Sequence, residues 1–280
     1  MKTNCKSLLT IVICLCLFSV AAGAQAKILT KKHRISDVTA KTTKVVLSGN
    51  EMFDVNYMTE ISRRWRISPF EFCTAEEYES LRKSSDFYFL VPVVNQRKKE
   101  AEPGIAMLCF EKGGKEEDAD PAKEAIEVIS IPYGPAEEST GREFVFLPAI
   151  IDIIQNYTLE AMTRDLIGYG GLASYVGKQH TDWKKEIYIA ESDLATSETQ
   201  GNKINYLEQD EVDAIFESGE PGTLVGYTVS PVNPDNGSVC YKMLFTSDTH
   251  ELYYFAKHNL KNNGAGFLKA DIKIISSLKK

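Results

Sequence analysis

The sequence has few residues of the kinds that build disulfide frameworks and metal sites. Its 280 residues include six cysteines and four histidines. Three cysteines lie within the first 16 residues, and the other three, Cys73, Cys109 and Cys240, show neither a disulfide framework nor the spacing of a zinc site. Because three is an odd number, at least one of them is unpaired in a monomer. The sequence therefore predicts no resident metal or other cofactor.

Long runs of basic residues are also missing. The formal net charge is −7, and the basic clusters, such as Arg97-Lys98-Lys99, are short. An acidic chain repels nucleic acid and anionic lipid unless its basic residues gather on one surface. We therefore expect no nucleic-acid partner.

The apolar run nearest the N-terminus, Leu8 to Val20, is shorter than the ~20 residues that a membrane span needs. Two lysines precede it, and small residues that suit cleavage follow at Ala24 and Ala26. We interpret residues 1–26 as a signal peptide, with a membrane anchor as the alternative. The expected product is exported to the periplasm or the medium, with no transmembrane span after cleavage.

The chain does contain a repeated order of elements. The first half reads as a short strand, a helix with an apolar residue every four positions, an edge strand, a short helix opened by a capping box, three strands and a long apolar helix. These elements are expected at 45–47, 53–65, 65–72, 74–81, 86–94, 104–111, 125–131 and 144–162, with Pro148 in the first turn of the last helix.

The second half repeats this order in shortened form. Strands are expected at 186–190, 223–230, 239–245 and 252–255, with helices at 208–218 and near the C-terminus. A polar stretch, 191–205, replaces the first helix. The pairs that begin matching elements are Val45/Ile187, Phe87/Leu224, Ile105/Val239, Ile126/Leu252 and Phe144/Phe267.

These patterns predict an α+β or α/β protein of two tandem related domains, each with a mixed sheet that ends in a three-stranded meander. The predicted parts are a signal peptide at 1–26, a flexible lead at 27–44, a first domain at 45–165, a linker at 166–185 and a second domain at 186–280. A helix apolar on most faces requires burial on both sides. We therefore expect 144–162 to lie between the two domains.

Three segments resemble the TolB N-terminal and CsgG-like α/β domains of bacterial envelope proteins. They are Val45-Val46-Leu47 before a helix, the strand Ser85-Asp86-Phe87-Tyr88-Phe89, and the polar turn Asp248-Thr249-His250-Glu251-Leu252. The chain is also similar to uncharacterised secreted bacterial proteins. The resemblance implies an envelope location and a binding or scaffolding role, and it brings no catalytic residues.

Two sites, formed by three residues, are weak candidates for chemistry. Asp248 and His250 are two residues apart, so on an extended strand they would share a face and could both contact a metal ion. An acidic turn residue and an edge histidine are the alternative. Cys73 precedes a helix whose N-terminal dipole would lower the pKa of its thiol, although no nucleophile signature surrounds it.

Aromatic residues are plentiful, with 13 Tyr, 13 Phe and 2 Trp. Tyr88, Tyr227 and Tyr253 lie on predicted strands and are candidates for an exposed surface that binds an envelope protein or a glycan. Cross-strand aromatic pairs inside the sheets are the alternative.

The function expected from the sequence is therefore a non-enzymatic binding or scaffolding protein of the bacterial cell envelope. The alternative is a hydrolase whose site lies at the cleft between the domains, near Phe144–Met162. The two hypotheses differ in one structural expectation, because only the hydrolase requires polar side chains to converge there.

Overall fold

The computed structural model describes residues 34–95, 104–114, 125–179, 184–196, 199–235 and 237–278. The signal peptide, the Arg97-Lys98-Lys99 cluster, His33 and His180 lie outside these residues. The elements in chain order are η1 Val38–Ala40, β1 Thr42–Val46, α3 Glu51–Arg64, β2 Phe70–Cys73, α4 Ala75–Leu81, β3 Phe87–Asn95, β4 Ile105–Gly113, β5 Ala125–Pro135, α5 Arg142–Thr163, α6 Asp165–Gln179, β6 Glu186–Ala190, η2 Glu191–Asp193, β7 Asn205–Leu207, α7 Gln209–Ser218, β8 Thr223–Val229, β9 Val239–Thr246, β10 Leu252–Asn259, η4 Leu260–Asn262 and α8 Lys269–Leu278.

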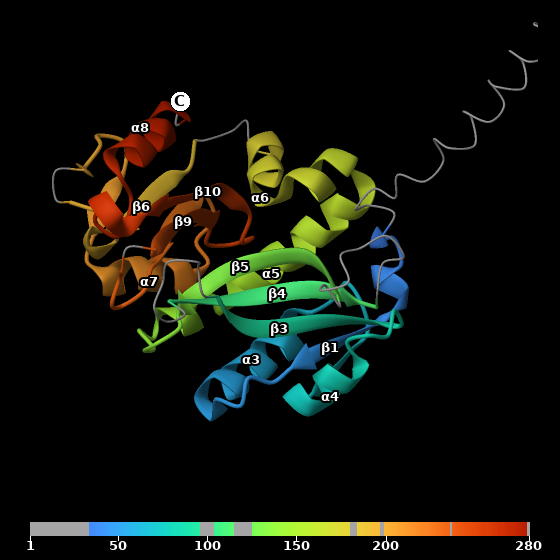
Figure 1. The fold of residues 1–280 in the computed structure, drawn as a ribbon. Coiled ribbons are helices and arrows are strands. Elements are labelled where there is room, and N and C mark those ends of the chain that lie inside the picture. Colours follow the sequence, from blue (N-terminus) through green and yellow to red (C-terminus); the bar gives the residue numbers. More distant parts are fainter. Residues whose placement is uncertain are drawn as a thin grey trace, which may run out of the picture.

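The fold is α+β and is built on two five-stranded mixed sheets (Figure 1). The strand order is β2-β1-β3-β4-β5 in the first sheet and β7-β6-β8-β9-β10 in the second. In the first, β1 runs parallel to β2 and β3, and β3, β4 and β5 form an antiparallel meander. The second sheet has the same directions at every matching pair. The repeated order predicted from the sequence is therefore confirmed as a repeated strand connectivity, and we call the two halves the first and second units.

The strand register corrects one of the matches made from the sequence. Val46 lies opposite Cys73 and Ala190 lies opposite Leu207 at the ends of matching strand pairs, so the pairing aligns Val46 with Ala190. The predicted match of Val45 with Ile187 differs from this alignment by two residues. Because side chains alternate between the two faces of a strand, a shift of two positions still places the matched residues on the same face. The three-residue strand β7 was not predicted, because it is too short to show a periodic pattern.

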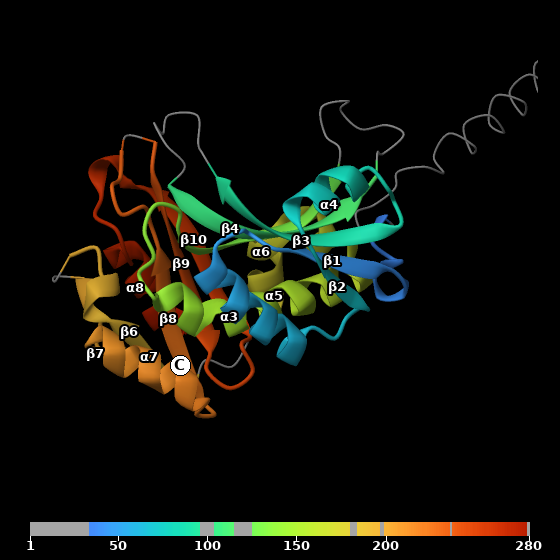
Figure 2. The ribbon, with the colours of Figure 1, turned by 90° about the horizontal axis from the view of Figure 1, so that it is seen from below.

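Helix α5 lies between the two units, as its apolar composition predicted. Figure 2 shows α3 and α5 on one face of the first sheet and α4 on the other. The far side of α5 contacts α7 of the second unit. One continuous hydrophobic core includes residues of both units, among them Phe146 of α5 and Phe245 of β9. Pro148 lies in the seventh position of the helix rather than in its first turn.

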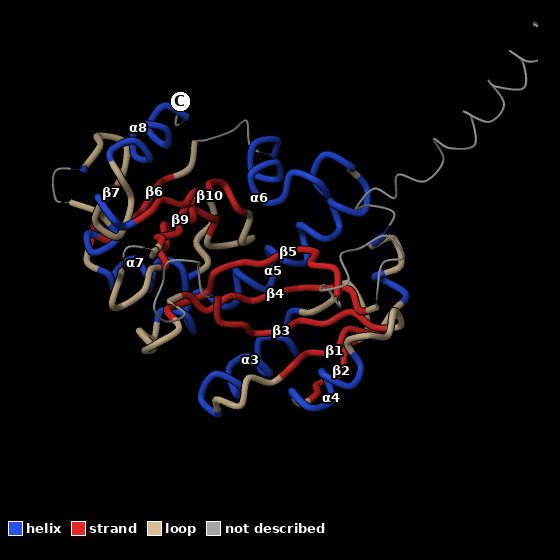
Figure 3. The backbone as a smooth tube through the Cα atoms, in the orientation of Figure 1, coloured by secondary structure: helices blue, strands red, loops and turns tan. Residues whose placement is uncertain are grey.

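Two predicted connecting segments are ordered parts of the fold. The predicted linker contains α6, which packs against α5 and β10 and bends where Gly171 adopts a φ of 62° (Figure 3). The predicted flexible lead is described from Arg34 onward, and there Ile35 and Val38 are completely buried. The sequence did not show this order, because local composition does not reveal which surfaces the rest of the chain covers. Within the described ranges, no helix combines the length and the apolar composition that a membrane span requires.

Asp37 ties this lead to the first sheet. Its carboxylate accepts hydrogen bonds from the Tyr88 hydroxyl at 2.6 Å and from Lys112 Nζ at 3.0 Å, and it pairs with Lys41 at 2.7 Å. Burial opposes ionisation, but these three partners outweigh it and hold the pKa of Asp37 well below its usual range.

This depressed pKa predicts a specific acid sensitivity. A carboxyl with a lowered folded-state pKa stabilises the protein above its unfolded-state pKa of about 3.9, and the contribution is lost as the pH falls toward the folded-state value. Asp37→Asn is therefore expected to lower stability at neutral pH and to flatten its decline below about pH 4. Urea unfolding at a series of pH values measures both effects. An unchanged acid profile would contradict the assignment, and Asp86→Asn, at an exposed loop position, is the control.

Candidate functional site

A cleft of about 580 Å³ lies where the two units meet. We call it the inter-unit cleft. It is lined by α3, the start of α5, the end of α7 and the turn between β9 and β10, through Asn56, Glu60, Arg63, Arg64, Phe144, Val145, Pro148, Phe216, Glu217, Gly219, Ser247, Asp248 and His250. Its walls therefore come from both units, and its lining is mainly polar, with charges of both signs and an apolar patch formed by Phe144, Val145, Pro148 and Phe216.

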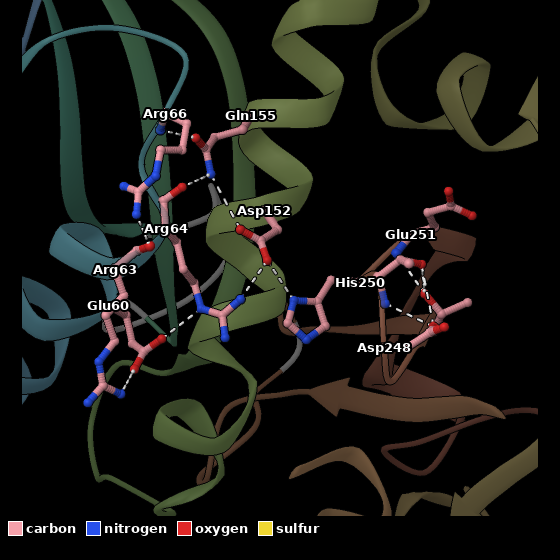
Figure 4. Close-up of polar contacts among 11 residues, drawn as sticks. Glu60, Arg63, Arg64, Arg66, Asp152, Gln155, Asp248, His250 and Glu251 are labelled. Atoms are coloured by element: carbon pink, nitrogen blue, oxygen red, sulfur yellow. Dashed lines mark hydrogen bonds and ion pairs between the residues drawn. The ribbon is translucent and has the colours of Figure 1, made fainter. Parts of the chain in front are cut away.

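At the edge of this cleft, His250 of the second unit contacts Asp152 of α5 (Figure 4). The His250 Nδ1 atom lies 2.7 Å from Asp152 Oδ2. A carboxylate accepts hydrogen bonds, so Nδ1 carries a proton in this contact, and the neutral form of the ring then has its lone pair on Nε2. Nε2 has no hydrogen-bond partner within the described part of the chain. The arrangement is an Asp–His dyad with one ring nitrogen still available.

Asp152 is itself held by the first unit. Arg64 Nη1 lies 2.8 Å from the same Oδ2 atom, and Arg64 Nε donates to Glu60 Oε2 at 2.7 Å. Gln155 donates to the Arg64 carbonyl at 3.0 Å and accepts from the Arg66 amide at 2.7 Å, which fixes the end of α3 against α5. The carboxylate that orients His250 is therefore anchored by an ion pair with the neighbouring helix.

The backbone of His250 is also unusual. Its φ of 56° lies in the left-handed region, where it is the one non-glycine residue of the described chain with a positive φ. Such a conformation costs about 1–3 kcal/mol for a non-glycine residue and persists only where the surroundings hold it. Here the Thr246 hydroxyl accepts from the Glu251 amide at 2.9 Å, and the ring stacks on Phe216 with centroids 5.2 Å apart. The turn thus aims the imidazole at α5.

Asp248 and His250 do not act together as the sequence suggested. They lie in a turn rather than on an extended strand, and Figure 4 shows their side chains turned apart. Asp248 accepts from the Thr249 amide at 2.9 Å, while His250 contacts Asp152. The described residues contain no group of three or more His, Cys, Asp or Glu side chains that could hold a metal ion. The other described histidine, His258, contacts the Gly264 carbonyl at 3.0 Å.

The remaining sequence candidates are buried. Tyr88, Tyr227 and Tyr253 are at most 6% exposed, so the predicted aromatic contact surface at these positions is wrong. Both faces of their strands are covered, and the Tyr227 hydroxyl, for example, donates to the Tyr133 carbonyl at 2.7 Å. Cys73 is also buried, and this burial raises the pKa of its thiol instead of lowering it. It makes no hydrogen bond to either described histidine.

Sequence reasoning missed Asp152 and Arg64. One signal was available, because Asp152 is the only charged residue between Phe144 and Leu159. A charge inside a helix buried on most faces requires a partner. The sequence could therefore have marked Asp152 as a contact point, although it could not have named His250, 98 positions away.

A second buried ion cluster joins the units and keeps the cleft walls in place. Arg142, the first residue of α5, donates to Asp193 at 2.9 Å and to Asp213 at 2.8 Å, and its guanidinium lies over the Tyr227 ring. Burial opposes the charged form, but the two carboxylates outweigh it and raise the pKa of Arg142. Both aspartates belong to the second unit, so this cluster crosses the same junction as the dyad.

Comparison with protein-family models, with curated proteins and with solved structures found no match to this chain. The resemblance to TolB N-terminal and CsgG-like domains therefore stays a prediction.

Proposed function

We propose that the protein is an exported binding protein of the bacterial cell envelope and that its ligand or partner enters the inter-unit cleft. The observation that carries the proposal is that both units line this cleft, which combines charged groups of both signs with a smaller apolar patch. Concave sites between domains, where a few polar groups converge, are frequent places of ligand binding.

The joining of the units supports the same proposal. The Arg142 cluster and the aromatic contacts of Phe146 fix α5 against the second unit, so the cleft walls are held before a ligand arrives. A site that is already ordered loses less conformational entropy on binding. The mainly polar lining, with its mixed charges and smaller apolar patch, suits a glycan or a peptide-like segment of an envelope protein, which are the partners that the sequence suggested.

The test uses the full chain expressed in a bacterium. We expect the protein in the periplasmic or extracellular fraction without residues 1–24 or 1–26, as N-terminal sequencing would show. The purified protein is then screened by thermal shift against soluble peptidoglycan fragments, oligosaccharides and short peptides. A ligand at 100 times its Kd adds about 2.7 kcal/mol of stability, which raises the melting temperature by several degrees.

The position of binding is tested with matched charge reversals. Asp248→Arg changes an exposed residue of the cleft, and Glu79→Arg changes an exposed residue of α4, outside the cleft. A ligand of the cleft should stabilise the wild-type protein and Glu79→Arg but stabilise Asp248→Arg much less. Equal stabilisation of all three proteins, or retention of the uncleaved chain in the cytoplasm, would refute the proposal.

A further inference from the structure

The inter-unit cleft contains a group that binding alone does not require. His250 is 7% exposed, it lines the cleft, and its Nδ1 atom is occupied by the Asp152 carboxylate. The remaining nitrogen, Nε2, therefore presents a lone pair. A histidine held in this tautomer by a carboxylate is the arrangement that takes a proton from a nucleophile.

We propose that the inter-unit cleft is the site of a hydrolase in which His250 is the general base, Asp152 is its positioning residue, and the substrate is a carboxylic ester or lactone. This inference rests on the cleft being the place where the ligand binds. It goes beyond the binding role, because it assigns a chemical step to that ligand.

The step needs only water. His250 Nε2 takes one proton from a water molecule as the water oxygen bonds to the acyl carbon and the carbonyl π electrons move to the carbonyl oxygen. Collapse of this tetrahedral intermediate breaks the bond between the acyl carbon and the alkoxide oxygen. His250 returns the proton to the leaving alkoxide, so the products are a carboxylic acid and an alcohol, with no oxidant or reductant.

The substrate class follows from what the cleft offers. A single base suffices for an ester, because an alkoxide leaves the tetrahedral intermediate more readily than the amine of an amide does. Phe144, Val145 and Pro148 provide an apolar wall for the acyl group. Arg63 lines the same cleft, and its side chain is 72% exposed and pairs with Glu60 at 3.5 Å. It is the cation that we assign to the developing oxyanion.

The test measures hydrolysis of p-nitrophenyl acetate and p-nitrophenyl butyrate by the purified chain. We expect kcat/KM to fall by about 10²–10⁴ in His250→Gln, which removes the base. His258→Gln removes the other described histidine, whose ring contacts a loop carbonyl, and should leave kcat/KM unchanged. Equal hydrolysis by the wild-type protein and His250→Gln, or none above the uncatalysed rate, would overturn the inference.

Asp152→Asn tests the positioning role. An asparagine amide can donate to Nδ1 and so favours the tautomer with the proton on Nε2, which is not a base. We expect kcat/KM to fall at least tenfold and its pH profile to change, whereas a merely structural role would leave the pH profile as it is.

Nitrogen NMR of the wild-type protein gives a reading that does not depend on whether a variant folds. The proposal requires neutral His250 to carry its proton on Nδ1, and a proton on Nε2 would overturn it. A ligand found by thermal shift that binds the wild-type protein and His250→Gln alike, when neither hydrolyses the esters, would remove the catalytic step and leave the binding role intact.

Discussion

Replacing Arg142 with methionine is expected to lower the free energy of unfolding by about 3–5 kcal/mol. The side chain is 7% exposed, and it neutralises Asp193 and Asp213, whose side chains are 4% and 13% exposed. Removing the cation leaves two carboxylates buried close together without a positive charge, although Asp193 still accepts a hydrogen bond from the Thr228 hydroxyl. The large loss of stability comes from burying two carboxylates that no cation neutralises. The intact cluster itself adds little net stability.

Urea unfolding measures this loss, and two variants test its cause. Arg164→Met removes an arginine that is 54% exposed and pairs with Glu160, so it should cost less than about 1 kcal/mol. Adding Asp193→Asn and Asp213→Asn to Arg142→Met should recover part of the lost stability, because the amides carry no charge. A loss below 1 kcal/mol in Arg142→Met would mean that the aspartates find other partners or protons.

Replacing Phe146 with alanine is expected to destabilise the protein by about 3–5 kcal/mol. The ring is fully buried at the junction, with centroids 4.3 Å from Tyr227, 4.8 Å from Phe216 and 5.5 Å from Phe245. All three partners belong to the second unit, while Phe146 lies near the start of α5, the helix that covers the first sheet. The cavity would therefore weaken the contact between the units as well as the core.

This prediction can be read from denaturant unfolding followed by fluorescence and circular dichroism. We expect the two transitions to coincide in the wild-type protein and to separate in Phe146→Ala, because the units lose part of their shared core. Met52→Ala, at a side chain that is 63% exposed on α3, should change stability by less than about 0.5 kcal/mol. Coincident transitions with a small loss in Phe146→Ala would show that α5 does not couple the units.

The elements of the fold were largely readable from the sequence, because their signals are local. The capping box at Thr74 and Glu77 forms with both of its hydrogen bonds, and α5 spans the predicted apolar run. The strands of both meanders begin within one or two residues of their predicted positions. Each of these features depends on neighbours within a few positions.

The incorrect predictions of exposed tyrosines share one cause, which is the burial of strands by helices from elsewhere in the chain. Tyr88 and Tyr227 looked like candidates for an exposed surface because alternating strands usually present one side to water. In β9 every residue from Val239 to Thr246 is buried, since α8 covers one face of the second sheet, and α5 and α7 cover the other. A strand cannot reveal from its own residues that a helix from elsewhere in the chain will cover it.

The sequence by itself determined the order of the elements and their duplication, since hydrophobic period, caps and turns act over short distances. The tertiary structure alone decided that α5 joins the units and that Asp152 contacts His250. These contacts link residues far apart in the sequence, where no periodic pattern predicts which residues will meet. The candidate site belongs to this second kind. Its chemistry depends on a 2.7 Å contact between two units of one repeated fold.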